Sequence, residues 1–136
     1  MAAGKYDITI EQGATFTLPI SYKDSNDAVI DLSSGYTARM RIKESVGGTL
    51  LASTESGDST GATITIALAS SGNNITISMT ATNTAALNFD HAVYDLELVS
   101  GSQVDRIIQG TVNLAKEVTV CVQIKSQFRQ LRIRLQ

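Results

Sequence analysis

The chain has 136 residues, of which 43% are hydrophobic, and a formal net charge of −2; this balance excludes an intrinsically disordered chain and is typical of one domain with a single core. The single cysteine, Cys121, excludes an intrachain disulfide and a cysteine-rich zinc site, and the single histidine, His91, leaves too few soft ligands for a metal cluster. The charge is uneven, because residues 1–117 hold 7 Lys/Arg and 13 Asp/Glu (−6), whereas residues 118–136 hold 4 Lys/Arg and no acid (+4).

The first part of the chain alternates apolar and polar side chains with the period of two that is typical of half-buried strands. This pattern predicts strands over residues 6–11, 15–22, 29–35, 36–43 and 49–54, the third being short and ending in a turn. Pro19 cannot donate to a strand ladder, so its strand is expected at a sheet edge or a bulge. The polar run of residues 23–28 has the composition of a turn.

Two hairpins are predicted in the second part of the chain. In residues 62–80 a turn at Ser71-Gly72 pairs Ile66 with Ile77 and places the apolar side chains of both strands on one face. Residues 81–89 are the one candidate for a helical turn. Residues 94–110 form the second hairpin, in which Gly101-Ser102 is the turn and Glu97 lies opposite Arg106. Residues 111–120 continue the sheet.

We therefore predict an all-β fold: an antiparallel, immunoglobulin-like β-sandwich of about eight or nine short strands with at most one short helical turn. The sandwich is expected over residues 1–120, and residues 121–136 form a basic C-terminal tail or an added strand. No apolar run approaches the roughly 18 residues that span a bilayer, and the first residues contain no apolar signal region. We expect a protein made in a cytoplasm, with no membrane partner.

The segment FDHAVYDLE, residues 89–97, contains four side chains of the metal-ligand type: Asp90, His91, Asp95 and Glu97. Asp95 and Glu97 share a strand face, but Asp90 and His91 precede that strand in a turn, so the four do not converge on one ion. A charge pair between Glu97 and Arg106 across the hairpin contributes about 0.2–1 kcal/mol. His91 is expected on the surface rather than as a general base or pH switch.

No nucleophile-elbow, phosphate-loop, zinc-protease, calcium-loop or dinucleotide motif is present. Cys121 lies in the apolar strand context VTVCVQI, where a thiol behaves as a small hydrophobic side chain. Asn74-Ile75-Thr76 matches the glycosylation sequon, which has a meaning only in a eukaryotic secretory route. We expect no catalytic residue, no cofactor, no metal and no small-molecule substrate; the chain is not expected to be an enzyme.

The outer face of the second hairpin is a candidate interface, formed by Asp95, Glu97, Arg106 and Ile108. In the predicted register the aliphatic Ile108 lies beside Asp95 on the face exposed to water. An aliphatic side chain at that position indicates that a neighbouring molecule covers this face.

The basic end of the chain allows three interpretations. Its cations are further interface candidates: Lys125, Arg129, Arg132 and Arg134. They could neutralise phosphates, or Leu131, Ile133 and Leu135 could form a strand added to a neighbour's sheet edge. The third interpretation is a terminus without regular structure. Nucleic acid is the least favoured partner, because residues 1–117 carry a negative charge that repels a polyanion.

Five sequence elements occur in a recognisable order over about residues 6–119: QGATF, IDLSSGYTARM, TAAL, YDLELVS and GTVNLAKEVT. Together they resemble a small domain of tailed-bacteriophage structural proteins. That domain occurs at the N-terminus of upper-baseplate and tail-fibre adaptor proteins and in small virion proteins of marine phages. The resemblance implies a β-sandwich that joins or decorates virion parts without catalysis, in three- or six-fold assemblies. This sequence departs from the pattern after Val120.

The leading hypothesis is a non-enzymatic phage virion protein in a tail, baseplate or fibre-attachment structure. Its partners would be other phage structural proteins and further copies of the chain, as a trimer or hexamer. The alternatives are a capsid decoration protein and, in a different class, a carbohydrate-binding module for cell-surface attachment. A sugar-binding module needs exposed aromatic rings, whereas the strand pattern predicts that all four tyrosines point toward the core: Tyr6, Tyr22, Tyr36 and Tyr94.

Overall fold

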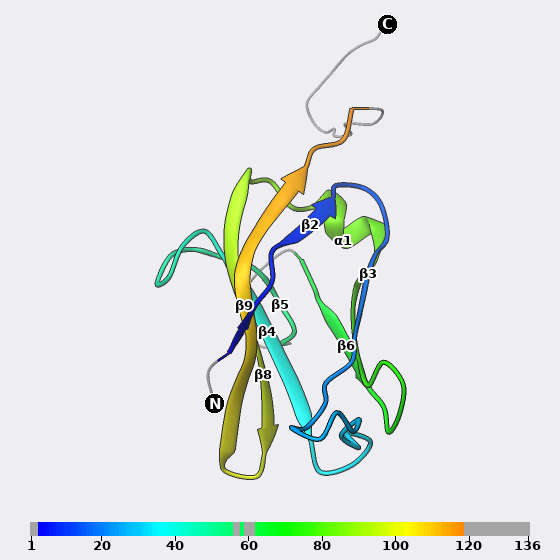
Figure 1. The fold of residues 1–136 in the computed structure, drawn as a ribbon. Helices are drawn as coiled ribbons and strands as arrows, with labels where there is room; N and C mark the ends of the chain where they lie inside the picture. The colour runs from blue at the N-terminus through cyan, green and yellow to red at the C-terminus, as the bar shows by residue number, and fades with distance from the viewer. Residues whose placement is uncertain (1–2, 56–57, 59–61, 119–136) are drawn as a thin grey trace, which may run out of the picture.

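Strands with alternating apolar and polar residues build two facing sheets in the computed structural model of the chain, which describes residues 3–55, 58 and 62–118 (Figure 1). One sheet has six strands and the other has three, and one short helix lies at the end where the last strand leaves the domain. The fold is mostly β with one short helix, as the sequence predicts. The expected tail over residues 121–136 lies outside the described residues.

The six-stranded sheet is mixed, so the prediction of a wholly antiparallel, strictly immunoglobulin-like sandwich is wrong in this respect. β1 and β2 run parallel to β9, with Ile8 opposite Val112 and Ile10 opposite Leu114. This register adds both isoleucines to the buried face of the sheet. The sheet has the order β1-β9-β8-β4-β5 with β2 also on β9, and it comprises β1 (Gly4–Lys5), β2 (Ile8–Glu11), β4 (Thr37–Lys43), β5 (Leu50–Ser53), β8 (His91–Ser100) and β9 (Gln103–Ala115).

The three-stranded sheet is antiparallel and has the order β3-β7-β6, from β3 (Phe16–Ile20), β6 (Thr65–Leu68) and β7 (Ile75–Met79). Ile66 lies opposite Ile77, so the register predicted for this hairpin is confirmed. The connection is longer than the predicted two-residue turn, because the last backbone bond runs from Ala69 N–H to Asn74 C=O and leaves residues 70–73 as the loop. β3 is an edge strand, as Pro19 predicts.

The core lies between the two sheets and is formed by the inward side chains of their central strands. Ile75 and Ile77 of β7, Ile42 of β4 and Leu96 of β8 are fully buried. Removing these side chains from water provides the main driving force for the fold, at about 25 cal/mol per Å² of apolar surface. The outward positions of the same strands are more accessible to solvent, so the period-two pattern sets which face is wet.

The helix α1 (Ala81–Ala85) fastens the connection between β2 and β3. Thr80 is its N-cap and accepts a hydrogen bond from the Asn83 N–H. Thr84 is fully buried; its hydroxyl donates to the Ala14 carbonyl at 2.8 Å and accepts from the Gly13 N–H at 3.0 Å. The helical turn expected over residues 81–89 is therefore present, and one of its polar side chains ties it to a distant loop.

The strand expected over residues 29–35 is absent from the described secondary structure. Val29 forms one isolated antiparallel bridge with Lys23, and Leu32 fills the core with 1% exposure. The Ile30 N–H still donates to the Tyr22 carbonyl at 3.2 Å, and the Asn74 side chain adds three further hydrogen bonds to the same two segments. This side chain accepts from the Tyr22 N–H and donates to the carbonyls of Tyr22 and Ile30. A buried amide thus supplements the few backbone hydrogen bonds in this part of the molecule.

Candidate functional site

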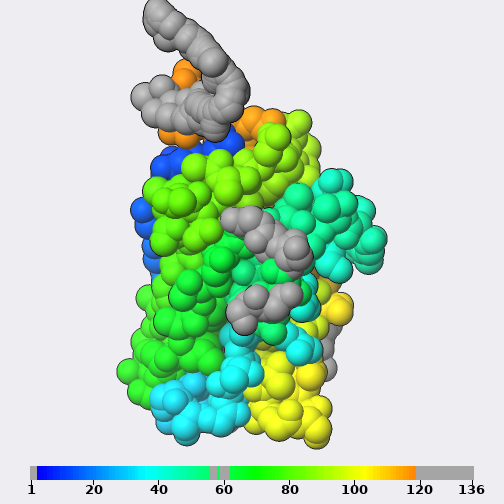
Figure 2. Space-filling view, turned by 180° about the vertical axis from the view of Figure 1, so that it is seen from behind, coloured from blue at the N-terminus to red at the C-terminus, as the bar shows by residue number. Residues whose placement is uncertain are grey.

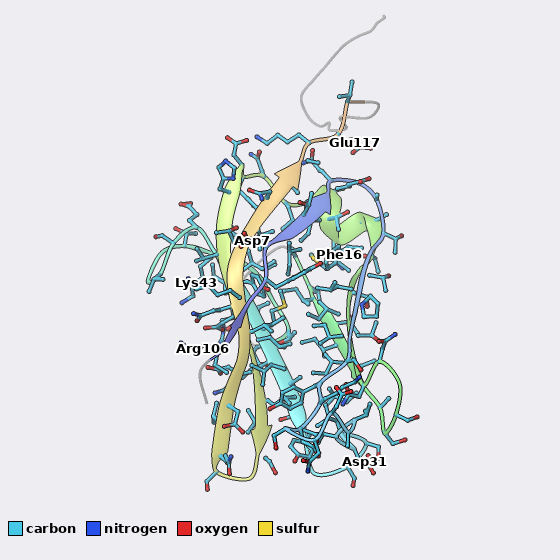
Figure 3. All side chains as sticks on the ribbon, viewed as in Figure 1. Asp7, Phe16, Asp31, Lys43, Arg106 and Glu117 are labelled. Atoms are coloured by element: carbon cyan, nitrogen blue, oxygen red, sulfur yellow. The ribbon has the colours of Figure 1, made fainter. Side chains whose placement is uncertain are left out.

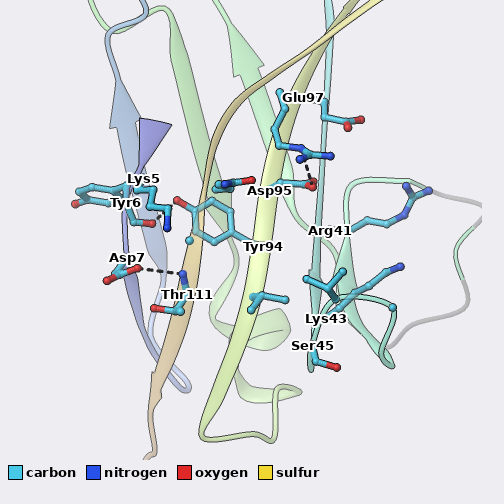
Figure 4. Close-up of a pocket in the computed structure, with 16 residues that line it drawn as sticks. Lys5, Tyr6, Asp7, Arg41, Lys43, Ser45, Tyr94, Asp95, Glu97 and Thr111 are labelled. Carbon is cyan, nitrogen blue, oxygen red and sulfur yellow. Dashed lines mark hydrogen bonds and ion pairs between the residues drawn. The ribbon is translucent and has the colours of Figure 1, made fainter. Parts of the chain in front are cut away.

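A groove with a volume of about 660 Å³ crosses the outer face of the six-stranded sheet (Figure 4). One wall is the N-terminal segment of residues 5–7, and the other is the loop of residues 45–47 that joins β4 to β5. Outward side chains of three strands form its floor: Arg41, Lys43, Val93, Asp95, Glu97, Arg106, Gln109 and Thr111. Three residues of the predicted interface, Asp95, Glu97 and Arg106, line this groove, and β4 and the N-terminal segment contribute others.

Arginine and carboxylate side chains pair across the strands of this floor. The Arg39 Nε lies 2.7 Å from a Glu97 carboxylate oxygen, and the Arg106 Nε lies 3.3 Å from an Asp95 oxygen. Glu97 and Arg106 are opposite each other in the backbone register, as predicted, but the predicted ion pair between them is not the one formed. The reason is that β4 presents Arg39 directly opposite Glu97 on the other side of β8.

A bulge in β9 changes the remainder of the predicted hairpin register. From the turn to the pair Glu97 and Arg106 the strands pair as predicted. β9 then has one extra residue, Ile107, so that Ile108 lies opposite Leu96. The prediction that Ile108 lies beside Asp95 is therefore wrong. The bulge turns Ile108 to the inner side of the sheet, where it packs partly buried against the core. It consequently gives no indication that the outer face is covered by a neighbour.

The N-terminal wall approaches β9 so closely that only glycine is accommodated at position 110. A Cβ on Gly110 would lie 2.2 Å from the Tyr6 carbonyl oxygen. The Asp7 carboxylate accepts the Thr111 N–H at 3.1 Å, and this hydrogen bond lowers the pKa of Asp7 below its usual value. The Tyr94 hydroxyl donates to the Tyr6 carbonyl at 2.6 Å; burial, followed by the nearby Asp7 charge, raises the pKa of Tyr94 to about 12.

The opposite wall is a tight loop that projects from the side of the molecule (Figure 2). The Gly48 N–H donates to the Ser45 carbonyl at 2.8 Å, and Val46 at the tip is 94% exposed. On the strand that precedes the loop, Arg41 pairs with Asp58 at 2.8 Å, and this hydrogen bond lowers the pKa of the Asp58 carboxyl. Figure 3 places Lys43, Asp7 and Arg106 along this side of the large sheet.

Two of the four tyrosines are more exposed than the strand pattern predicts. Tyr6 is 51% exposed and Tyr36 is 37% exposed, whereas Tyr94 is buried and Tyr22 packs partly buried against the core. Tyr6 lies in the break between β1 and β2, where alternation is interrupted. The prediction that all four point inward is therefore wrong, and an exposed aromatic ring lines the groove.

The N-terminal wall had one sequence signal that was not used. A glycine inside a strand pattern marks a close backbone approach, and Gly110 occupies such a position in β9.

The segment FDHAVYDLE does not form a joint site. His91 is exposed and its Nδ1 lies 2.5 Å from the Asn113 side-chain oxygen, while Asp90 pairs with Lys116 at 3.3 Å. Within the part of the chain that the structure describes, no group of three or more His, Cys, Asp or Glu is placed to hold a metal ion. Cys121 and the four basic interface candidates, Lys125, Arg129, Arg132 and Arg134, lie outside the described residues.

No helix among the described residues is long and apolar enough to cross a membrane. Comparison of the chain with models of known protein families finds no match, and comparison with curated protein sequences finds none either.

Proposed function

We propose that this chain is a non-enzymatic structural protein of a tailed-bacteriophage virion, assembling through its sheet surfaces and termini into a tail, baseplate or fibre-attachment structure. The ordered resemblance over about residues 6–119 supports the virion, and a two-sheet β domain is the architecture that this resemblance implies. The chain is made in the cytoplasm of the bacterial host and functions in the particle. Its partners are other structural proteins of the phage and further copies of itself, as a trimer or hexamer.

The proposal that the protein is not an enzyme is supported by one observation: each carboxylate of the groove already has a partner within the chain. Glu97 pairs with Arg39, Asp95 with Arg106, and Asp7 accepts the N–H of Thr111. A general base needs a carboxylate that is available to a substrate proton and has a pKa raised toward neutrality, whereas the pKa of Asp7 is lowered. The carboxylates of the groove are thus fixed and compensated within the chain, which suits specific contact with another protein surface.

The finer fold assignment belongs to the same proposal. β3-β7-β6 take the positions of strands B, E and D of an immunoglobulin-like sandwich, and β9-β8-β4 take those of G, F and C. The first strand departs from that scheme, because it joins β9 instead of β3. We infer a variant of the immunoglobulin-like order in which one sheet keeps an unpaired edge.

The virion assignment is tested on purified particles of the phage that encodes the chain. Mass spectrometry should detect the protein at a fixed copy number, and gold-labelled antibodies should mark the tail or baseplate. Labelling of the head surface would instead establish the capsid decoration protein. The purified chain should have the molar mass of a trimer or hexamer in solution. A monodisperse monomer that is absent from particles would refute the proposal.

Carbohydrate binding remains the second candidate, because the structure supplies an aromatic ring that the strand pattern did not. Tyr6 lines the groove at 51% exposure, beside polar side chains that include Gln109 and Thr111. Screening the protein on a glycan array tests this candidate, and Tyr6→Ala should abolish any binding that uses the groove. Tyr36→Ala is the matched control, since Tyr36 is exposed but does not line the groove. An array without a hit would remove this function.

A further inference from the structure

The two sheets are open toward each other along one side of the molecule. There an apolar cavity of about 260 Å³ is lined by Tyr6, Leu18, Pro19, Ile20 and Ile108, which we call the open seam. Its residues come from the break between β1 and β2, from β3 and from β9. The seam therefore lies where the edge of the small sheet faces the N-terminal edge of the large one.

β3 forms one border of the seam and has no strand on its outer side among the described residues. Pro19 lacks an N–H and lies opposite Thr76, so this is a pair that exchanges no backbone bonds with β7. By alternation, the N–H and C=O of Thr17 and the C=O of Pro19 point to the outer side. They are the groups with which an added strand pairs.

The inward side chains of β3 are less well covered than those of its neighbour β7. Leu18 and Ile20 are only partly buried, although their cross-strand partners Ile77 and Ile75 are completely buried. The core is thus short of apolar cover on the side where β3 lacks a partner strand. An incoming strand with an apolar face would remove this surface from water as well as pair with the backbone.

The chain itself contains a segment of that pattern immediately after the domain. Residues 118–124 read VTVCVQI, with Val118, Val120, Val122 and Ile124 alternating with Thr, Cys and Gln. At about 3.3 Å per residue this segment exceeds the length of β3. The segment also opens the positively charged end of the chain (+4), whereas residues 1–117 carry −6, so its attraction to another copy of the domain is favourable.

The direction in which the chain leaves the domain favours a second copy over the chain's own seam. The Glu117 N–H donates to the Gln12 side-chain oxygen at 2.9 Å, which holds the exit point at the end of the sheets, and Val118 is 95% exposed. To enter its own seam the chain must reverse direction there. Residues 118–124 contain no Gly, Pro, Asn or Asp and begin with β-branched residues, which are poor turn formers.

We propose that residues 118–124 of one copy add as a strand to the outer edge of β3 in a second copy, with the valines filling the open seam. This inference rests on the proposed assembly function and names its contact. The addition completes the small sheet in the order donor-β3-β7-β6 and links copies head to tail, which closes into a ring where the rotation between copies allows.

Cys121 provides the test, because it is the only cysteine of the chain and would lie on the outward face of the added strand. Directly opposite residues on adjacent strands have Cα atoms within about 4.5–5.5 Å, which a disulfide spans. Single variants of the full chain place a second cysteine at outward positions of β3: Thr17→Cys, Pro19→Cys and Ser21→Cys. After mild oxidation, at least one should form disulfide-linked dimers and higher species on a non-reducing gel. Thr65→Cys on β6, at the opposite edge of the same sheet, is the matched control.

Linkage that is specific to β3 positions supports the proposal. Equal linkage of the Thr65→Cys control, or no linkage at any β3 position, overturns it. A faster-migrating monomer with an internal disulfide also overturns it, because the chain then fills its own seam.

The molar mass of the full chain separates this inference from the proposed function. The double change of Val120 and Val122 to Lys should lower the molar mass to that of the monomer, whereas the same change at Thr119 and Gln123 should leave it unaltered. An oligomer whose mass is unaffected by the valine variant refutes the strand exchange and leaves the virion assignment standing. A native monomer that is absent from particles refutes both.

Discussion

The Asn74→Ala variant tests the contribution of one buried amide that joins two backbone segments. Asn74 is completely buried, and its side chain makes hydrogen bonds of 2.7, 2.9 and 2.7 Å to the Tyr22 N–H, the Tyr22 carbonyl and the Ile30 carbonyl. Alanine removes all three bonds; the Tyr22 N–H and the Ile30 carbonyl lose the partner that they have here, whereas the Tyr22 carbonyl keeps the bond from the Ile30 N–H. The same contacts show that the sequon at Asn74 has no accessible amide in the folded chain.

The magnitude follows from the number of bonds. A net contribution of about 1 kcal/mol for each hydrogen bond gives a loss of about 3 kcal/mol in the free energy of unfolding. This is a large share of the roughly 5–15 kcal/mol that a domain of this kind possesses. The melting temperature should fall by about 10 °C, since 1 kcal/mol corresponds to roughly 3–4 °C at this chain length.

Urea denaturation followed by far-ultraviolet circular dichroism measures the effect, and thermal melting provides a second reading. Asn73→Ala is the matched control, because Asn73 is the exposed neighbour in the same loop and should change stability by less than about 0.5 kcal/mol. If the two variants are equally stable, the hydrogen bonds from Asn74 to the backbone of Tyr22 and Ile30 do not stabilise the fold, and the reasoning is refuted.

Three further predictions concern the N-terminal wall and the helix. Gly110→Ala places a Cβ 2.2 Å from the Tyr6 carbonyl oxygen and should destabilise the protein by about 2 kcal/mol in urea denaturation. The hydrogen bond from Thr111 lowers the pKa of Asp7 in the folded chain. The stabilisation by Asp7 is therefore complete above the unfolded pKa of about 4 and is lost as the pH falls through the lower folded pKa. Asp7→Asn should make the free energy of unfolding less dependent on pH in this acidic range. Thr80→Ala removes the N-cap of α1 and should cost about 1 kcal/mol.

Two of these variants have a matched control, and the third has a result that would contradict it. Gly4→Ala is expected to be tolerated, because its Cβ would lie 3.7 Å from the nearest atom; equal destabilisation by both alanines would contradict the close approach at Gly110. Thr82→Ala changes an exposed threonine in α1 and should be nearly neutral. An Asp7→Asn profile that parallels the native one between pH values of about 2 and 5 would show that the hydrogen bond does not shift this titration.

Period-two patterning was sufficient to predict most of the strands and both hairpins. Ile66 opposite Ile77 and Glu97 opposite Arg106 follow from turn position and from which face is apolar. Pro19 correctly indicated an edge strand, since a residue without an N–H is excluded from the middle of a sheet. These features are local, because each depends on residues that are close together in the sequence.

The features that were not predicted depend on contacts between distant segments. The sequence pattern of residues 4–11 predicts a strand but does not indicate that it pairs in parallel with β9 rather than with β3. The sequence signal for the bulge is the adjacent apolar pair Ile107-Ile108, at which the inward-facing positions of β9 change from odd to even numbers. In an unbulged strand the same pair predicts that Ile108 lies on the outer face. The ion pair between Arg39 and Glu97 was not predicted, because the two residues lie on strands that are 58 positions apart in the sequence.

The parallel pairing of β2 with β9 also has a consequence for the order in which the protein can be made and folded. Asp7 and Thr111 are 104 positions apart, so the first strand leaves the ribosome long before its partner exists. Ile8 and Ile10 cannot pair with Val112 and Leu114 until the last strand has been synthesised, and pairing over such a separation is slow. A chain that is interrupted before residue 112 cannot close its large sheet. The large sheet can therefore be completed only after the final strand has been synthesised.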